Sequence, residues 1–281
     1  MTVDDLMTLL AAGTVGYAAA AGLARLRLAA PPAVSMRINV SGRPVPAVLG
    51  GPAAVAGLTA LACLAIVGAL GWEPARLAET GVAVAAVTVV MAIAGGWDDR
   101  RGDETSRGFK GHLGALRSGR LTGGILKIVA GLVPGMVAAV LLFPDDLGAA
   151  SATVLLVALG ANTINLFDRA PGRAAKVVVL IATPLMAVGH IDWAIAAAGA
   201  VGALLACLPL DLHERAMLGD AGANPLGALL GVGLALSLEG VGRWVAVALM
   251  LALNLASERW SFSTAIESTP WLRRLDRFGR K

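Results

Sequence analysis

Apolar runs long enough to cross a lipid bilayer recur along almost the whole of this sequence. A transmembrane helix needs about 20 consecutive apolar residues, and this chain is 57% hydrophobic and only 15% charged. Its mean hydropathy of +0.75 is far above that of a water-soluble domain of 281 residues. None of the runs alternates with the period of two that a barrel strand requires. The sequence therefore predicts an all-α, polytopic membrane protein.

The number of apolar runs predicts a bundle of about nine spans. Residues 1–257 would form the transmembrane domain, and residues 258–281 either a basic cytoplasmic tail or a helix lying on the membrane surface. The acidic start "MTVDDLM" is unlike a secretory signal, so the first run is expected to remain as a helix. Small Ala and Gly residues would let the shorter runs pack inside the bundle. The predicted spans are 5–28, 48–71, 81–96, 123–143, 150–166, 175–189, 193–209, 225–238 and 243–257.

The distribution of basic residues predicts the orientation in the membrane. With nine spans, five segments on one side hold 20 of the 23 Lys and Arg residues, and the positive-inside rule makes that side cytoplasmic. The N-terminus would then lie outside and the C-terminus in the cytoplasm of a plasma membrane protein. The basic balance follows from these loops, and no motif indicates nucleic-acid binding. The five segments are 25–47, 97–122, 167–176, 210–224 and 258–281.

The most polar stretch, "GGWDDRRGDETSRGFKGHLG" (95–114), follows the third predicted span. Asp98 and Asp99 are adjacent there, at the negative end of a helix and close to lipid, and each circumstance penalises ionised carboxylates. Arg100 and Arg101 could compensate in an ordinary charged helix end. The alternative is a divalent cation, which carboxylate oxygens would hold together with substrate phosphates.

Two further polar segments are predicted on the same side. In "NTINLFDRAPGRAAK" (162–176), Asn162, Asn165 and Asp168 recur every three residues, either as helix-packing groups and a solvated loop or as parts of a site. In "LPLDLHERAMLGDAGANPLG" (208–227), Asp220 lies between glycines, either as the N-cap of the next helix or as a ligand. The convergence of three acidic segments at one membrane face predicts a cytoplasmic site.

The ordered motifs resemble one enzyme superfamily, the polyprenyl-phosphate N-acetylhexosamine-1-phosphate transferases, which includes the phospho-MurNAc-pentapeptide translocase. The resemblance extends over about residues 35 to 230. It implies a bundle of transmembrane helices with a cytoplasmic, Mg²⁺-dependent active site. The motifs are "RINVSGRPVPAVLGG" (37–51), "DDRRGD" (98–103), "LTGGILKI" (121–128), "NTINLFD" (162–168) and "MLGDAGAN" (217–224).

The resemblance implies a reaction and its partners. The phosphate of a polyprenyl carrier would attack the β-phosphate of a nucleotide-sugar, expected to be UDP-linked, to give a lipid-diphosphate-sugar for cell-envelope synthesis. Relatives in the superfamily often form dimers, so a homodimer is one arrangement that the resemblance suggests.

The same resemblance implies roles for individual residues. Asp220 would bind Mg²⁺, and Asp98 and Asp99 would lie beside the metal and orient or deprotonate the lipid phosphate, with Asp98 a second ligand. Lys127 would neutralise phosphate in the catalytic centre, although a lysine at the start of a span can instead reach toward the interface. Substrate-binding roles fall on Arg43, Lys110, Asn162, Asn165, Asp168 and His213.

The chain also departs from the family pattern. Where the family continues with a second aspartate and "DGLA", this chain reads "DRAPGRA", and it has no histidine-rich loop near its end. These departures keep open a non-catalytic relative that binds polyprenyl phosphate or an envelope-assembly partner. A transporter ranks third, because the charges lie at one mouth of the bundle only. Cys63 and Cys207 lie in apolar spans, so we expect neither a disulfide nor zinc binding.

Overall fold

A computed structural model describes residues 1–29, 36–39, 42–69, 76–101 and 123–280. In this part of the chain the fold is almost entirely α-helical, as predicted, with one two-stranded antiparallel sheet formed by β1 (Met36–Ile38) and β2 (Pro44–Pro46). The long helices are α1 (Val3–Ala29), α2 (Gly50–Ala69), α3 (Arg76–Arg101), α5 (Gly123–Leu142), α6 (Leu147–Phe167), α7 (Arg173–Val188), α8 (Ile191–Leu212), α9 (Asp220–Ser237) and α10 (Val241–Ser257). Two short helices follow, α11 (Phe262–Ser268) and α12 (Pro270–Arg277).

The long helices support a membrane protein but not the predicted number of spans. Each of the predicted ranges coincides with one of these helices. Within the described residues, however, only α1, α3, α6 and α8 are long and apolar enough to cross a membrane alone. Helices α10 and α11 would make a fifth span if taken together, but the pair is bent by 92°. The nine-span prediction is not supported, since helices such as the 16-residue α7 are too short to pass that test.

Helix α9 is the centre of the bundle, with α2, α3, α6 and α7 among the helices packed against it. Its glycines allow this packing. A Cβ atom on Gly227 would lie 2.1 Å from the carbonyl oxygen of Gly160 in α6, and one on Gly231 would lie 2.4 Å from that of Leu156. Backbones that approach so closely need small residues. Because nearly every residue of α9 is buried, the position of its first residue, Asp220, is fixed by the surrounding helices.

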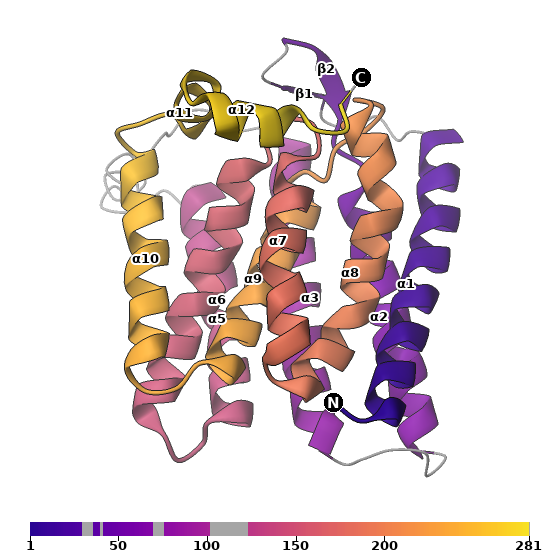
Figure 1. Cartoon of the computed structure of the whole chain (residues 1–281), viewed down its shortest axis with the longest axis vertical. Coiled ribbons are helices and arrows are strands. Elements are labelled where there is room, and N and C mark those ends of the chain that lie inside the picture. Colours follow the sequence, from indigo (N-terminus) through magenta and orange to yellow (C-terminus); the bar gives the residue numbers. More distant parts are fainter. Residues whose placement is uncertain (30–35, 40–41, 70–75, 102–122, 281) are drawn as a thin grey trace.

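The β-hairpin and the last two helices lie at one end of the bundle, opposite the N-terminus (Figure 1). The backbone of Met217 links this hairpin to the start of α9, donating to the carbonyl of Pro46 at 2.9 Å and accepting from the N–H of Leu49 at 3.1 Å. We call this end of the bundle the site end. The fold thus places β1, the end of α3 and the start of α9 close together.

Candidate functional site

Three carboxylates meet around one arginine at the site end. Asp98 and Asp99 come from the last turn of α3, Asp220 is the first residue of α9, and Arg37 is the central residue of β1. Nη2 of Arg37 lies 2.8 Å from Oδ1 of Asp99, 3.3 Å from Oδ2 of Asp220 and 4.0 Å from Oδ2 of Asp98. We call Asp98, Asp99 and Asp220 the carboxylate cluster. The structure therefore brings two of the acidic motifs together around a cation.

Asp99 caps helix α9 from another helix. Its Oδ1 accepts the backbone N–H of Asp220 at 3.0 Å, and its Oδ2 accepts that of Ala221 at 2.9 Å. A helix leaves its first N–H groups without partners inside the helix, and a carboxylate there also faces the positive end of the dipole. Asp99 is only 3% exposed, so these bonds offset part of the cost of burying its charge.

Gly219 lets the carboxylate of Asp99 approach the helix. It is the N-cap residue of α9 and has φ +67°, a conformation that favours glycine. A Cβ atom at this position would lie 2.8 Å from Oδ2 of Asp99. The alternative interpretation of Asp220 as the N-cap is therefore wrong, since Gly219 holds that position and Asp220 begins the helix itself.

Arg37 is the basic residue that the sequence prediction missed. Burial lowers the pKa of Arg37, but the charges of Asp220 and Asp99 outweigh burial and raise the pKa above its ordinary value, so the guanidinium stays charged. Arg43, which was expected to bind phosphate, lies elsewhere: its side chain is 75% exposed and its Nη1 is 3.2 Å from Oε2 of Glu214. The two arginines occur in one motif, and only the pairing of the strands distinguishes them.

A second acidic pair lies beside the carboxylate cluster. Asp168, at the C-cap of α6, is 7% exposed, and Asp211, in the last turn of α8, is 4% exposed. Burial, followed by the charges of Asp211 and Asp220, raises the pKa of Asp168 well above its ordinary value, although the backbone N–H of Gly219 opposes this shift. Oδ2 of Asp211 is buried with no hydrogen-bond partner among the described residues. Asp211 was not predicted, because "LPLDLH" carries no recognisable motif.

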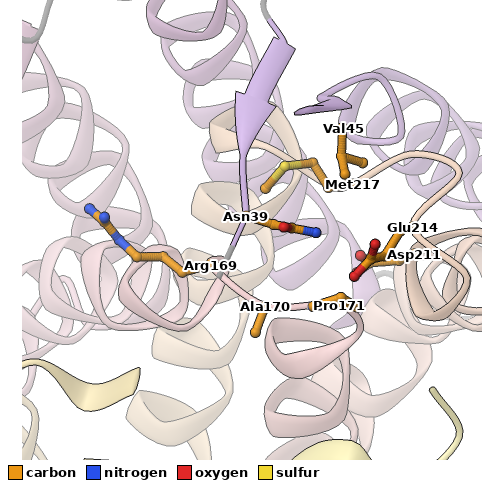
Figure 2. A pocket seen from close by; sticks show the side chains of 8 residues that line it. All are labelled: Asn39, Val45, Arg169, Ala170, Pro171, Asp211, Glu214 and Met217. Atoms are coloured by element: carbon orange, nitrogen blue, oxygen red, sulfur yellow. The ribbon is translucent and has the colours of Figure 1, made fainter. Parts of the chain in front are cut away.

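A small pocket opens next to this acidic pair (Figure 2). Asp211 and Glu214 line one side of it, and Asn39 reaches in from the end of β1, whereas the side chain of Arg169 points away from the other residues. The remaining lining residues are Val45, Ala170, Pro171 and Met217. The pocket is therefore acidic and lies at the segment "DRAPGRA".

The two asparagines of α6 do not join the carboxylate cluster. The side-chain amide of Asn162 donates to Oδ1 of Asn254 in α10, and the amide of Asn254 donates to the hydroxyl of Thr163 at 2.9 Å. This is the helix-packing interaction that was the alternative interpretation for Asn162. Asn165 is half-buried, one turn before Asp168.

The structure does not place the remaining predicted residues in this geometry. His213 is exposed at the C-cap of α8. Lys110 lies outside the described residues, as does the side chain of Lys127 in α5. Cys207 is a free, buried cysteine. Among the described residues, no group of three or more His, Cys, Asp and Glu side chains is arranged to hold a metal ion.

No family model matches this chain, and no curated protein matches it. The resemblance of its motifs to the polyprenyl-phosphate transferases therefore stays a prediction. The chemistry of the site has to be argued from its own charges, which are two buried carboxylates and one partly exposed carboxylate around one guanidinium at the end of an apolar bundle.

Proposed function

We propose that this protein transfers a phosphosugar from a nucleotide-sugar, expected to be UDP-linked, to a polyprenyl phosphate at the cytoplasmic face of a plasma membrane. The observation that carries the proposal is the convergence of Asp98, Asp99 and Asp220 around Arg37. Burying several carboxylates together is costly. A site that must gather a cation and anionic phosphates is a physical reason to keep them.

The cytoplasmic placement of the site follows from the positive-inside rule. Five segments hold 20 of the 23 Lys and Arg residues. The described residues of these segments lie at the site end, whereas Arg76 and Arg243 lie in the first turns of helices at the opposite end. In this proposal the nine long helices cross or enter the membrane together, the N-terminus lies outside and the C-terminus lies in the cytoplasm. A nucleotide-sugar made in the cytoplasm then reaches the site directly.

The cluster fits Mg²⁺ in the kind of its donor atoms. Mg²⁺ prefers oxygen ligands and binds through one or two carboxylates together with substrate phosphates and water. In the proposed reaction Asp220 and Asp98 hold Mg²⁺, which would supply positive charge where two anionic phosphates meet. Asp98 is the more accessible of the two, with 21% of its side chain exposed against 2% for Asp220.

The contacts of Asp99 support a positioning role. Both of its oxygens accept backbone N–H bonds from α9, and Arg37 adds a third contact at 2.8 Å. A carboxylate held in this way keeps the first residue of α9, Asp220, in place. Within the cluster, Arg37 is the candidate for contact with phosphate, because it is positively charged and 35% of its side chain is exposed.

A non-catalytic protein that binds polyprenyl phosphate is the second candidate function. It is favoured by the position of Arg37 among the carboxylates, where a metal ion would have to compete with the guanidinium. It is also favoured by the segment "DRAPGRA", which stands where the similar superfamily has "DGLA". Arg173 of this segment donates two hydrogen bonds to Asp276 and so has a structural partner.

The test is a reaction in nanodiscs with undecaprenyl phosphate, Mg²⁺ and a panel of UDP-sugars, with mass spectrometry of the lipid and an assay of released nucleoside monophosphate. Asp98→Asn and Asp220→Asn should abolish the product. Asp145→Asn, the same change at an exposed position before α6, is the matched control and should leave it intact. Tight binding of polyprenyl phosphate with no product from any donor would instead favour the non-catalytic function.

A further inference from the structure

The amphipathic helix α12 has its apolar side turned away from the protein. Trp271, Leu275 and Phe278 are 63%, 61% and 78% exposed, and their spacing of four and then three residues places them on one face of the helix. Asp276, on the opposite face, is only 6% exposed and is turned toward the bundle. A helix on a water-soluble protein shows the reverse arrangement. We call Trp271, Leu275 and Phe278 the outer stripe.

The orientation of α12 is fixed by buried contacts with α7. Arg173 donates from Nε to Oδ1 of Asp276 at 2.7 Å and from Nη2 to Oδ2 at 2.8 Å. Lys176 donates to the backbone carbonyls of Leu275 at 3.3 Å and Phe278 at 3.1 Å, at the C-terminal end of α12. Cations at a helix C-terminus are favourable. The outward direction of the stripe is therefore held by specific interactions.

The neighbouring helix α11 is attached in the same way. The ring of Phe262 stacks on Phe167 at the end of α6, with 5.4 Å between the ring centroids. The hydroxyl of Ser263 accepts a hydrogen bond from Nη1 of Arg173 at 2.8 Å. Helices α11 and α12 thus form one unit, which packs on the ends of α6 and α7 that lie at the site end.

The position of this unit follows from its connection to α10. Helix α10 exposes large apolar side chains along its length, including Trp244, Leu249 and Leu255, and ends at Ser257. The chain then bends by 92° into α11. Figure 1 shows α11 and α12 lying across the site end of the bundle, roughly perpendicular to α10. A chain that leaves an apolar helix and bends at once lies at the level where the membrane meets water.

We propose that the outer stripe, together with Trp260, binds an anionic lipid surface, namely the headgroup layer of the membrane that contains the bundle. Trp260 is 67% exposed in the turn between α10 and α11, and tryptophan favours the bilayer interface. The exposed basic residues of the unit supply the complementary charge. They are Arg259, Arg273, Arg274 and Arg277.

This proposal needs the protein to lie in a membrane but does not depend on the transferase reaction. It assigns α11 and α12 a partner of defined chemistry: acyl chains and glycerol groups for the outer stripe, and phosphate headgroups for the arginines. The contacts of the buried carboxylate of Asp276 with α7 then hold α12 so that its apolar side faces outward.

The experiment places a fluorescent label on the stripe of the full-length protein in nanodiscs. Cys63→Ala and Cys207→Ala remove the native thiols, and Trp271→Cys carries an environment-sensitive fluorophore. The probe lipids are phosphatidylcholine and phosphatidylglycerol with brominated acyl chains, which quench a fluorophore on contact. Emission should fall with both lipids, and should fall further with brominated phosphatidylglycerol. A label at Arg273→Cys, on another face of α12, should be quenched less than the label on the stripe.

The charge requirement is tested with two matched double variants. Arg259→Gln with Arg274→Gln should abolish the preference for phosphatidylglycerol while quenching by phosphatidylcholine persists, which shows that the unit is still seated. Arg25→Gln with Arg27→Gln, two exposed positions at the same end in α1, should keep the preference. Absence of quenching by either lipid would overturn the proposal and direct attention to a protein partner. Equal quenching by both lipids in the labelled protein with all its arginines intact would overturn the proposed preference for anionic lipid.

Discussion

The ion pair between Arg173 and Asp276 should control how often the C-terminal helices detach from the bundle. Only 4% of each side chain is exposed, and two hydrogen bonds join them. Nη2 of Arg280 lies 2.7 Å from the same carboxylate, and Lys176 lies nearby. Asp276 is therefore the shared anion of three cations.

The contacts predict an asymmetric cost for the two single substitutions. Removing one partner from a buried ion pair costs about 3–5 kcal/mol, because the other charge is left uncompensated. Asp276→Leu leaves three cations together and should fall at the upper end of this range. Arg173→Met leaves Asp276 with Arg280 and should fall at the lower end. Since each 1.4 kcal/mol is about a factor of ten, even Arg173→Met should raise the open population on the order of 100-fold.

Hydrogen exchange measured by mass spectrometry on the protein in nanodiscs reads this population directly. Peptides from 262–280 should exchange faster in both variants, whereas peptides from α8 and α9 should not change. Arg277→Met is the matched control, because its partner Glu267 is exposed and such surface pairs contribute about 0–1 kcal/mol. The double variant Arg173→Met with Asp276→Leu should be less destabilised than the sum of the single variants.

Two results would refute this reasoning. If Arg277→Met accelerated exchange as much as Asp276→Leu, the buried pair would have no special role. If Arg173→Met cost more than Asp276→Leu, the packing of the arginine chain, and not the accumulation of cations, would determine how firmly the unit is held.

Three further predictions concern stability. Gly227→Ala places a Cβ atom 2.1 Å from a carbonyl of α6 and should lower the melting temperature, at a cost of about 1–3 kcal/mol, whereas Gly22→Ala meets no atom within 4 Å and should cause no loss. Arg37→Gln leaves the negative charges of the carboxylate cluster uncompensated, so it should cost about 1–3 kcal/mol of stability. Mg²⁺ should restore more of this stability than NaCl of equal ionic strength. Equal effects of the two salts would argue against a metal site. Burial raises the pKa of Asp276, but the hydrogen bonds and charge of Arg173 outweigh burial and lower it. Exchange in 262–280, corrected for its intrinsic pH dependence, should thus stay constant above the unfolded-state value of about 3.9 and rise only as the pH falls below it; a rise already near pH 6 would contradict this sign.

The sequence was sufficient for the helices but not for the number of spans. Apolar composition and polar loops located every long helix in the described ranges, because both signals are local. Whether a helix such as α7 crosses the membrane depends on its neighbours, since 16 residues are fewer than the roughly 20 that a lone span needs.

The site was predictable where its residues lie in sequence motifs and not where the fold selects between similar residues. Asp98, Asp99 and Asp220 were recognised from adjacent charges and glycines at predicted helix ends. Arg37 was missed in favour of Arg43, because the motif alone does not show that Arg37 lies in β1 beside the carboxylates and that Arg43 lies just before β2, close to Glu214.

The segment "DRAPGRA" shows the same limit. It was interpreted only as a departure from the motifs of a similar superfamily, yet its Arg173 has a structural partner, Asp276, 103 positions later in the chain. No local pattern in either segment indicates that these two residues meet.

The capping of α9 by Asp99 also constrains how the chain can be assembled. The N-cap residue Gly219 has no side chain to cap the helix, and the carboxylate that accepts its first N–H groups comes from a residue 121 positions earlier. The first turn of α9 therefore cannot satisfy its backbone in this way until α3 is already in place. The later half of the protein therefore completes the first turn of this helix only in contact with the earlier half. The acidic centre then forms only when both halves have joined, so an incomplete chain would carry the motifs without the site.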